Sequence, residues 1–324
     1  MSGKGWSTAG HAAWWPAPAK LNLCLHVTGR RADGYHELQT IFQIIDLCDE
    51  LSFERAPSGV IERRDDGLAH SGALAAIPSD KDLCVRAARA LLAAAEAKGV
   101  AAGSGDEVTG VVIRVRKRIP MGGGLGGGSS DAATTLLALN RLWGLEFGEE
   151  TLAEIGLPLG ADVPVFVRGR CALGEGVGER LTPLELPERW FLVLHPRVSV
   201  PTASVFQAPE LTRNSPVLTI PALLASGGRN DCEPVVRQRF PEVAEAIDWL
   251  ARFAPARLTG TGSCIFASFG SAAEAERVAA RVPDLWRVWV VRAMSRSPVF
   301  SRLQDSAPPR WFLRHRVCWG VAKW

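Results

Sequence analysis

The stretch that decides the fold reads Pro120-Met121-Gly122-Gly123-Gly124-Leu125-Gly126-Gly127-Gly128-Ser129-Ser130-Asp131, a run dense in glycine. The apolar segment before it, residues 108–119, predicts a strand, and the segment after it, residues 129–142, predicts a helix. Glycine lets a backbone turn sharply and approach a ligand closely. The amides at the start of a helix attract anions, and the helix dipole adds to that attraction. We therefore expect this loop to hold a phosphate chain.

Three other interpretations of the glycine run are weaker. A flexible hinge or tight turn would not need a strand before it and a helix after it. A Walker A loop ends in Gly-Lys followed by Ser or Thr, and no lysine stands there. The dinucleotide fingerprint G-x-G-x-x-G is matched by Gly122, Gly124 and Gly127, but so dense a run matches it almost automatically, and no apolar strand with a final acidic residue follows promptly. A kinase-type phosphate loop fits best, with Ser129 and Ser130 capping the helix or offering hydroxyls to phosphate.

The rest of the chain predicts mixed strands and helices. Residues 20–27 alternate between apolar and polar side chains, so Lys20 and Asn22 share one face of a strand. Strands and helices alternate without a series of parallel βαβ units, which indicates an α+β fold with a domain boundary near residues 181–188. We expect further strands at residues 40–45, 50–55, 163–167, 190–194, 256–258, 264–269 and 287–291, helices at 82–97, 150–155, 241–253 and 272–281, and a loop over 56–79.

Composition indicates a globular cytoplasmic protein. The chain has 324 residues, 22% charged and 47% hydrophobic, with a formal net charge of +3 that gives no reason to expect nucleic acid. No apolar run reaches the roughly 18 residues of a membrane span, and residues 1–15 do not resemble a secretory signal. The seven cysteines are scattered and never form a C-x-x-C pair, so we interpret them as buried thiols rather than as zinc ligands, disulfides or a catalytic nucleophile.

Five ordered motifs resemble those of the GHMP kinases. They are the glycine run with Ala132-Ala133 after it, Pro18-Ala19-Lys20-Leu21-Asn22-Leu23, Arg31-Ala32-Asp33-Gly34-Tyr35-His36, Gly160-Ala161-Asp162-Val163-Pro164, and Gly260-Thr261-Gly262-Ser263-Cys264. The resemblance implies a two-domain GHMP kinase fold with the active site between the domains. It places an S5-like N-terminal domain at residues 16–183 and a ferredoxin-like C-terminal domain at 184–298, with terminal extensions at 1–15 and 299–324.

The resemblance also implies the reaction. ATP would phosphorylate a hydroxyl of a cytidine diphosphate-linked methylerythritol, giving the 2-phosphate, in the non-mevalonate isoprenoid pathway. ATP would bind to residues 120–130 and to Lys117. The sequence offers no separate metal cage, so Mg²⁺ would be carried mainly by the ATP phosphates. ATP and the polyol would be the small-molecule partners of a monomer or weak homodimer, with no nucleic acid and no membrane.

Two residues carry the implied chemistry. Asp162 would be the base that accepts the hydroxyl proton, and Lys20 would hold that carboxylate and the hydroxyl in line. Phosphoryl transfer depends chiefly on such positioning and on charge stabilisation. The alternatives are a turn residue for Asp162 and a solvated strand charge for Lys20.

The acceptor side of the resemblance centres on a cytosine. Tyr35 and Phe206 would stack on its two faces, and His36 would bond its edge. Plain core packing is the alternative for the two aromatic residues. Asn22 would contact substrate near the reacting end. One departure concerns Asp82, where the family usually has Asn near the adenine, because an ionised Asp accepts hydrogen bonds but donates none. The remaining implied substrate contacts are Thr202, Gly260, Thr261 and Gly262.

Two further hypotheses stay open. Another acceptor within the superfamily, such as homoserine or a mevalonate-type alcohol, would have no use for the aromatic pair at Tyr35 and Phe206. A nucleic-acid-binding module is suggested by the S5-like fold and the basic residues of 114–118. Those residues lie on a strand, where only alternate side chains share a face.

Overall fold

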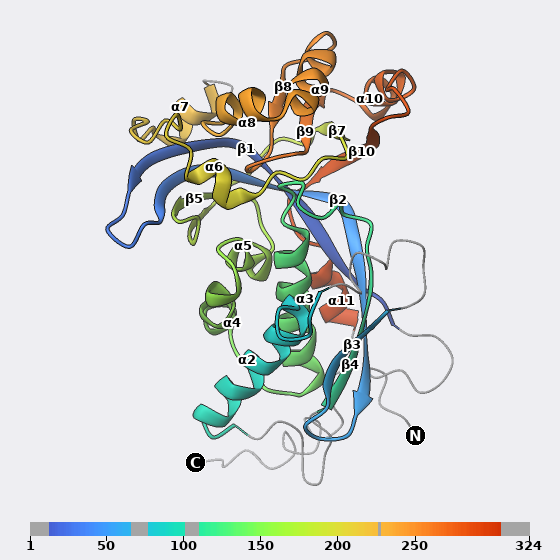
Figure 1. The fold of residues 1–324 in the computed structure, drawn as a ribbon. Coiled ribbons are helices and arrows are strands. Elements are labelled where there is room, and N and C mark those ends of the chain that lie inside the picture. Colours follow the sequence, from blue (N-terminus) through green and yellow to red (C-terminus); the bar gives the residue numbers. More distant parts are fainter. Residues whose placement is uncertain (1–12, 66–76, 101–109, 226–227, 306–324) are drawn as a thin grey trace, which may run out of the picture.

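A computed structural model describes residues 13–65, 77–100, 110–225 and 228–305. Two long strands, β1 (Trp15–Arg30) and β2 (His36–Ala56), form an antiparallel hairpin that runs through the molecule (Figure 1). Within the described ranges ten strands join one sheet in the order β3-β4-β2-β10-β7-β9-β8, with β1 and β5 paired to β2 and β6 paired to β5. The predicted α+β class is confirmed.

One part of the fold packs helices against the long strands. Helix α3 begins at Gly127, within the glycine run, and lies between α2, α5 and β1. Helix α2 begins after Asp82, whose carboxylate accepts hydrogen bonds from the amides of Cys84 and Val85 and so satisfies the first free donors of the helix. The elements are β3 (Ile61–Asp65), α2 (Leu83–Ala97), β4 (Gly110–Arg116), α3 (Gly127–Leu142), α4 (Glu149–Gly156), the 3₁₀ helix η1 (Leu157–Leu159), α5 (Val163–Arg168), β5 (Ala172–Gly176), β6 (Arg180–Pro183) and α11 (Val299–Asp305).

The other part packs helices over the second half of the sheet. Strand β10 pairs with β7 and also reaches β2, where Ala293 lies opposite Ile45, so it joins the two parts. Helices α8, α9 and α10 lie on the outer side of these strands (Figure 1). The elements are β7 (Trp190–His195), α6 (Thr202–Phe206), α7 (Ile220–Ala225), α8 (Glu233–Arg239), α9 (Pro241–Ala251), β8 (Ala256–Leu258), β9 (Ile265–Phe269), α10 (Ala272–Ala279) and β10 (Arg287–Met294).

Three sequence-based expectations were wrong. Residues 163–167 form helix α5 rather than a strand, with Pro164 in its first turn and Gly169 ending it in a left-handed conformation. The strands expected at 40–45 and 50–55 are one strand, β2, which continues through residues 46–49 while paired with β1. Part of the expected loop at 56–79 is strand β3, which pairs parallel with β4; residues 66–76 lie outside the described part.

The terminal extensions are described only in part. Residues 1–12 and 306–324 lie outside the described residues. Helix α11 packs on the N-terminal core through Val299, with Phe300 and Leu303 beside it. The domain bounds at 16–183 and 184–298 stay predictions.

The glycine loop is fixed where the two parts meet. Leu125, in the middle of the loop, is buried in a cluster with Leu21 of β1 and Val193 of β7. Burial of one such side chain stabilises the fold by about 1.5–3 kcal/mol. Because this cluster draws on both parts of the sheet, the loop cannot shift without disturbing the junction.

Candidate active site

A cavity of about 610 Å³ lies along the glycine loop and is lined from both parts of the fold. Such a volume suits a small-molecule ligand. Several predicted site residues do not line it: Ser130, Tyr35, His36 and Gly262. The predicted residues that line it are Lys20, Asn22, Lys117, residues 120–129, Asp162, Thr202, Phe206, Gly260 and Thr261.

Two positions explain why the loop is built of glycine. Gly124 has a φ of +75°, and a Cβ there would lie 2.2 Å from the carbonyl oxygen of Thr259. Gly126 has a φ of +72°, and a Cβ there would lie 2.9 Å from the ring of Phe166. Both positions combine a left-handed backbone with close neighbours, so an L side chain is excluded on two grounds. The loop backbone therefore packs directly against its neighbours, including the backbone of Thr259, before α3 begins.

Lys20 is buried at the centre of the cavity wall with three oxygen partners. Its Nζ donates to Asn22 Oδ1 at 2.5 Å and to the Gly124 carbonyl at 3.0 Å, and it lies 3.3 Å from Asp162 Oδ2. Its side chain is only 4% exposed, whereas that of Asp162 is 31% exposed. The ammonium is thus held rigidly, while the carboxylate keeps a side open to the cavity.

Asn22 is oriented by its own neighbours. Its Oδ1 accepts from Lys20, and its Nδ2 donates to Thr40 Oγ1 at 2.8 Å. Thr40 in turn donates to the carbonyl of Cys24 at 2.6 Å. This chain of bonds places Asn22 on the Lys20 face of β1, as the alternation in the sequence predicts.

The serines at the start of α3 differ in their surroundings. Ser129 lines the cavity, and its Oγ lies 3.3 Å from where a Cβ on Gly160 would stand, close to the Asp162 motif. Ser130 is fully buried, and its Oγ has no protein hydrogen-bond partner. Ser129 is therefore the hydroxyl that is placed to meet a ligand.

His36 lies against Phe206, which lines the cavity. Their rings stack with centroids 5.1 Å apart and planes 27° apart. Tyr35, at the turn of the β1–β2 hairpin, is 64% exposed and outside the cavity lining. The structure thus brings His36 to Phe206 and leaves the neighbouring Tyr35 exposed.

Arg213 fixes the His36–Phe206 pair. Its Nε donates to His36 Nε2 at 3.1 Å, and its Nη2 donates to the Phe206 carbonyl at 3.0 Å. Because arginine only donates, His36 Nε2 must accept, which leaves the ring proton on Nδ1. Burial, and then the charge of Arg213, lower the pKa of His36, so the ring is neutral at pH 7.

Comparison with known proteins shows where this chain belongs. The model for the N-terminal domain of GHMP kinases matches residues 82–170, and that for the C-terminal domain matches residues 210–288. The 4-diphosphocytidyl-2-C-methyl-D-erythritol kinase of Halorhodospira halophila is 53% identical over 296 residues, covering 90% of the chain and 97% of that relative. The kinase of that name from Pseudomonas aeruginosa is 52% identical over 289 residues, covering 89% of the chain and 96% of the relative. This chain belongs to the 4-diphosphocytidyl-2-C-methyl-D-erythritol kinase family of GHMP kinases.

Solved structures agree with this family. A crystal structure of 4-(cytidine 5'-diphospho)-2C-methyl-D-erythritol kinase matches with a TM-score of 0.69 and 37% identity, covering 87% of the chain and 99% of that structure. The mevalonate kinase of Methanococcus jannaschii matches with a TM-score of 0.63 but only 16% identity, covering 89% and 100%. This second likeness concerns the fold alone.

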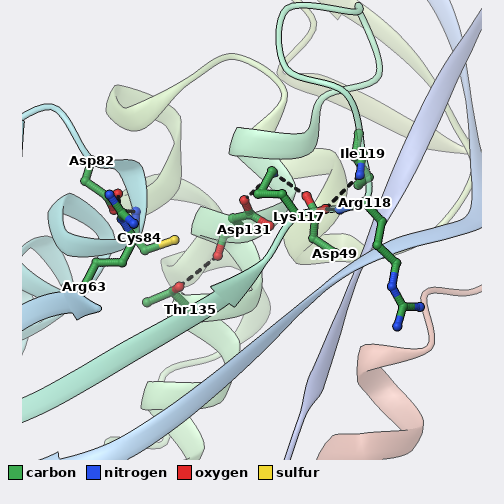
Figure 2. Close-up of polar contacts among 9 residues, drawn as sticks. All are labelled: Asp49, Arg63, Asp82, Cys84, Lys117, Arg118, Ile119, Asp131 and Thr135. Atoms are coloured by element: carbon green, nitrogen blue, oxygen red, sulfur yellow. Dashed lines mark hydrogen bonds and ion pairs between the residues drawn. The ribbon is translucent and has the colours of Figure 1, made fainter. Parts of the chain in front are cut away.

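In this member of the kinase family, two buried ionic groups lie beside the cavity, which Arg63, Asp82, Lys117 and Asp131 line; Figure 2 shows their contacts. Asp82 pairs with Arg63 at 2.5 Å, and both side chains are less than 10% exposed. Lys117 lies between two carboxylates, Asp49 and Asp131, and donates to both. The Lys117 ammonium is therefore already committed to protein partners, although its side chain lines the cavity.

Several residues of this kinase were missed by sequence reasoning. Arg213 lies in a segment without a motif. Thr40 lies inside strand β2, where nothing in the sequence marks it as a partner of Asn22. Asn230 donates to the carbonyls of Leu258 at 2.9 Å and Gly260 at 2.7 Å, and so holds the second glycine loop. The adjacent polar residues Asn230 and Asp231 were the one signal that the sequence offered, because polar side chains that become buried must find partners.

The described residues contain neither a metal-binding cluster nor a membrane-spanning helix. No group of three or more His, Cys, Asp or Glu side chains there is arranged to hold a metal ion. None of the helices in the described ranges is long and apolar enough to span a membrane.

Proposed function

We propose that this kinase transfers the γ-phosphoryl group of ATP to a hydroxyl of 4-diphosphocytidyl-2-C-methyl-D-erythritol, giving the 2-phosphate, in the non-mevalonate isoprenoid pathway. The single observation that carries the mechanism is the buried Lys20 beside the part-exposed Asp162, 3.3 Å apart, at the edge of the glycine loop. The family relationship supplies the acceptor.

Asp162 accepts the proton of the attacking hydroxyl. Its carboxylate has one oxygen toward Lys20 and a side open to the cavity. The ammonium of Lys20, 3.3 Å away, holds that carboxylate in place beside the cavity. Lys20 itself is fixed by Asn22 and the Gly124 carbonyl, so little reorganisation is needed when negative charge develops on the transferring group.

The glycine loop receives the phosphate chain. Its backbone is held open by its glycines, it lines the cavity along its length, and it leads into the N-terminus of the sixteen-residue helix α3. Mg²⁺ would arrive on the ATP phosphates, where it neutralises the charge that develops during transfer. Lys20 supplies a further positive charge from the protein.

The His36–Phe206 pair receives the cytosine. The Nδ1–H of a neutral His36 is a donor for an acceptor atom on the base edge, and Phe206 offers a face for stacking. Tyr35, exposed on the adjacent turn, would cover the opposite face of the base. Thr202 and Thr261, whose hydroxyl oxygens lie 3.0 Å apart, would contact the polyol diphosphate between the base and Asp162.

Incubation with ATP, Mg²⁺ and the cytidylated methylerythritol tests the reaction. We expect ³¹P NMR to show a new phosphomonoester signal beside an intact diphosphate, in amounts equal to the ADP formed. Hydrolysis of ATP without a new ester would contradict the proposal, and so would loss of the acceptor diphosphate.

The cellular setting follows from the same assignment. We propose a cytoplasmic monomer or weak homodimer. The six cysteines that the structure describes are all free, which suits a reducing compartment.

A further inference from the structure

Two buried carboxylates share one ammonium directly beneath the glycine loop. Asp49 is completely buried, and the side chains of Lys117 and Asp131 are 8% and 6% exposed. Lys117 Nζ lies 2.8 Å from Asp131 Oδ2 and also contacts Asp49 Oδ2 (Figure 2). If both acids were ionised, the cluster would hold one uncompensated negative charge out of contact with water, which is costly.

The two carboxylates are not equivalent. Asp49 Oδ1 accepts from the backbone amides of Arg118 at 2.6 Å and Ile119 at 2.9 Å, so every contact of this side chain comes from a donor. Asp131 Oδ1 is buried and has no hydrogen-bond partner. Asp49 accepts from three donors, whereas Asp131 accepts only from Lys117, so the negative charge is better stabilised on Asp49 and a proton held by the pair is better placed on Asp131.

The groups around Asp131 agree with this assignment. Burial raises the pKa of Asp131 to about 8, with the neighbouring charge of Asp49 acting in the same direction and that of Lys117 against it. From α2, Cys84 faces Asp131, and burial raises the pKa of that thiol well above its usual value, so it stays neutral. The other charged groups near the cluster are paired: Asp82 with Arg63 beyond Cys84, Arg118 with Glu50, and Lys20 with Asp162 across the loop.

The cluster is close enough to the loop to affect an anion there. A Cβ on Gly127, the first residue of α3, would lie 3.3 Å from Lys117 Nζ. Asp49 also fixes the amides of the two residues just before Pro120, where the loop starts. A net charge on the cluster would therefore change the electrostatic potential at the position proposed for the ATP phosphates.

We propose that Asp131 is a positioning residue that works in its protonated form, so that the Asp49–Lys117–Asp131 cluster anchors the glycine loop without placing net negative charge beneath the bound ATP phosphates. The nucleotide part of this proposal rests on the proposed function. The protonation part does not.

Two matched substitutions separate the carboxylates. Asp131→Asn keeps the shape and the neutrality of a protonated carboxyl group, whereas Asp49→Asn removes the charge that Lys117 and two amides require. We expect Asp131→Asn to keep nearly full activity at pH 7. We expect Asp49→Asn to lose activity and to melt at a lower temperature.

The pH dependence of stability follows from the sign of the shift. Between the ordinary Asp value of 3.8 and about 8, the folded chain keeps a proton that the unfolded chain has released. Raising the pH through this window therefore costs stability, and Asp131→Asn removes that loss. Its Tm should exceed that of the wild type at pH 8, with the difference shrinking toward pH 5.

Binding of ATP gives a second, independent measurement. In the wild type, ionisation of Asp131 above pH 8 should weaken ATP binding about tenfold by pH 9.5, the order expected for one added buried charge near the phosphates. With Asp131→Asn the affinity, measured by calorimetry in the same buffers, should stay flat. If neither protein binds ATP, the assignment of the glycine loop to ATP fails. The Tm values, and the infrared spectra described next, still decide whether Asp131 is protonated.

Infrared spectroscopy tests the proton directly. The difference spectrum between the wild type and Asp131→Asn at pH 7 should contain the C=O stretch of a protonated carboxyl group. Absence of that band would overturn the proposal, as would a Tm at pH 8 that Asp131→Asn lowers as much as Asp49→Asn does. Identical pH profiles of ATP affinity in the wild type and Asp131→Asn would overturn its nucleotide part.

Discussion

Replacing Asp162 with Asn tests the base of the proposed mechanism most sharply. The substitution keeps the size and shape of the side chain but removes its ability to take a proton. Lys20 keeps its bonds to Asn22 Oδ1 and the Gly124 carbonyl, so the wall of the cavity should survive.

The two consequences differ greatly in size. Two unit charges 3.3 Å apart attract by about 5 kcal/mol at an effective dielectric constant of 20, but desolvation and the 31% exposure of Asp162 reduce the net contribution to about 1 kcal/mol. For a chain of 324 residues this corresponds to a fall in Tm of about 1–2 °C. Loss of a general base costs about 10²–10⁴ in rate.

The assay is ADP release at saturating ATP, Mg²⁺ and acceptor, with Tm and ATP affinity measured on the same preparation. We expect Asp162→Asn to lose at least a hundredfold in kcat while both other quantities stay near wild type. Asp248→Asn, which removes a surface carboxylate paired with Arg237, is the control and should change nothing. A kcat for Asp162→Asn within tenfold of wild type would refute Asp162 as the base.

Three further predictions concern residues around the cavity. Tyr35→Ala should raise the KM of the acceptor about tenfold, by loss of one stacking face, and leave the KM of ATP unchanged; equal effects on both would remove Tyr35 from the base pocket. Arg213→Ala should raise the acceptor KM and lower kcat little, because it frees the ring of His36; an unchanged acceptor KM would mean that this ring does not contact the base. Asp82→Asn should lower the free energy of unfolding by about 1–3 kcal/mol in denaturant titration, because it removes the Asp82 carboxylate from its buried contact with Arg63; a change below about 0.5 kcal/mol would show that the pair adds little.

Local pattern predicted most of the elements because their hydrophobic faces follow the expected periods. The pattern was not informative where a segment is buried on all sides, because such a segment has no polar face to reveal a helical or strand period. Residues 163–167 are apolar throughout and all buried, so their sequence cannot distinguish a strand from a short helix. Strand β3 has the opposite problem, because its polar sequence Ile61-Glu62-Arg63-Arg64-Asp65 belongs to an edge strand whose partner, β4, lies far along the chain.

In the candidate site, too, residues in local motifs could be predicted, whereas residues whose role depends on distant parts of the chain could not. Motifs singled out the glycine loop, Lys20 and Asp162, because each lies in a short segment with its own chemical pattern, and the structure brings all three to one cavity. Arg213 could not be predicted, since its importance comes from meeting His36, which lies 177 positions away in the sequence. The proton that we propose on Asp131 depends on Asp49, which a separate strand brings to the same ammonium.

The most direct test of the central claim compares two acceptors. ADP release is measured with ATP and Mg²⁺, first with 4-diphosphocytidyl-2-C-methyl-D-erythritol and then with the same polyol phosphate without the cytidine. We predict turnover with the cytidylated acceptor alone, which would join the kinase chemistry at Lys20 and Asp162 to the base pocket at His36 and Phe206. Turnover with neither acceptor, or equal turnover with both, would contradict this account.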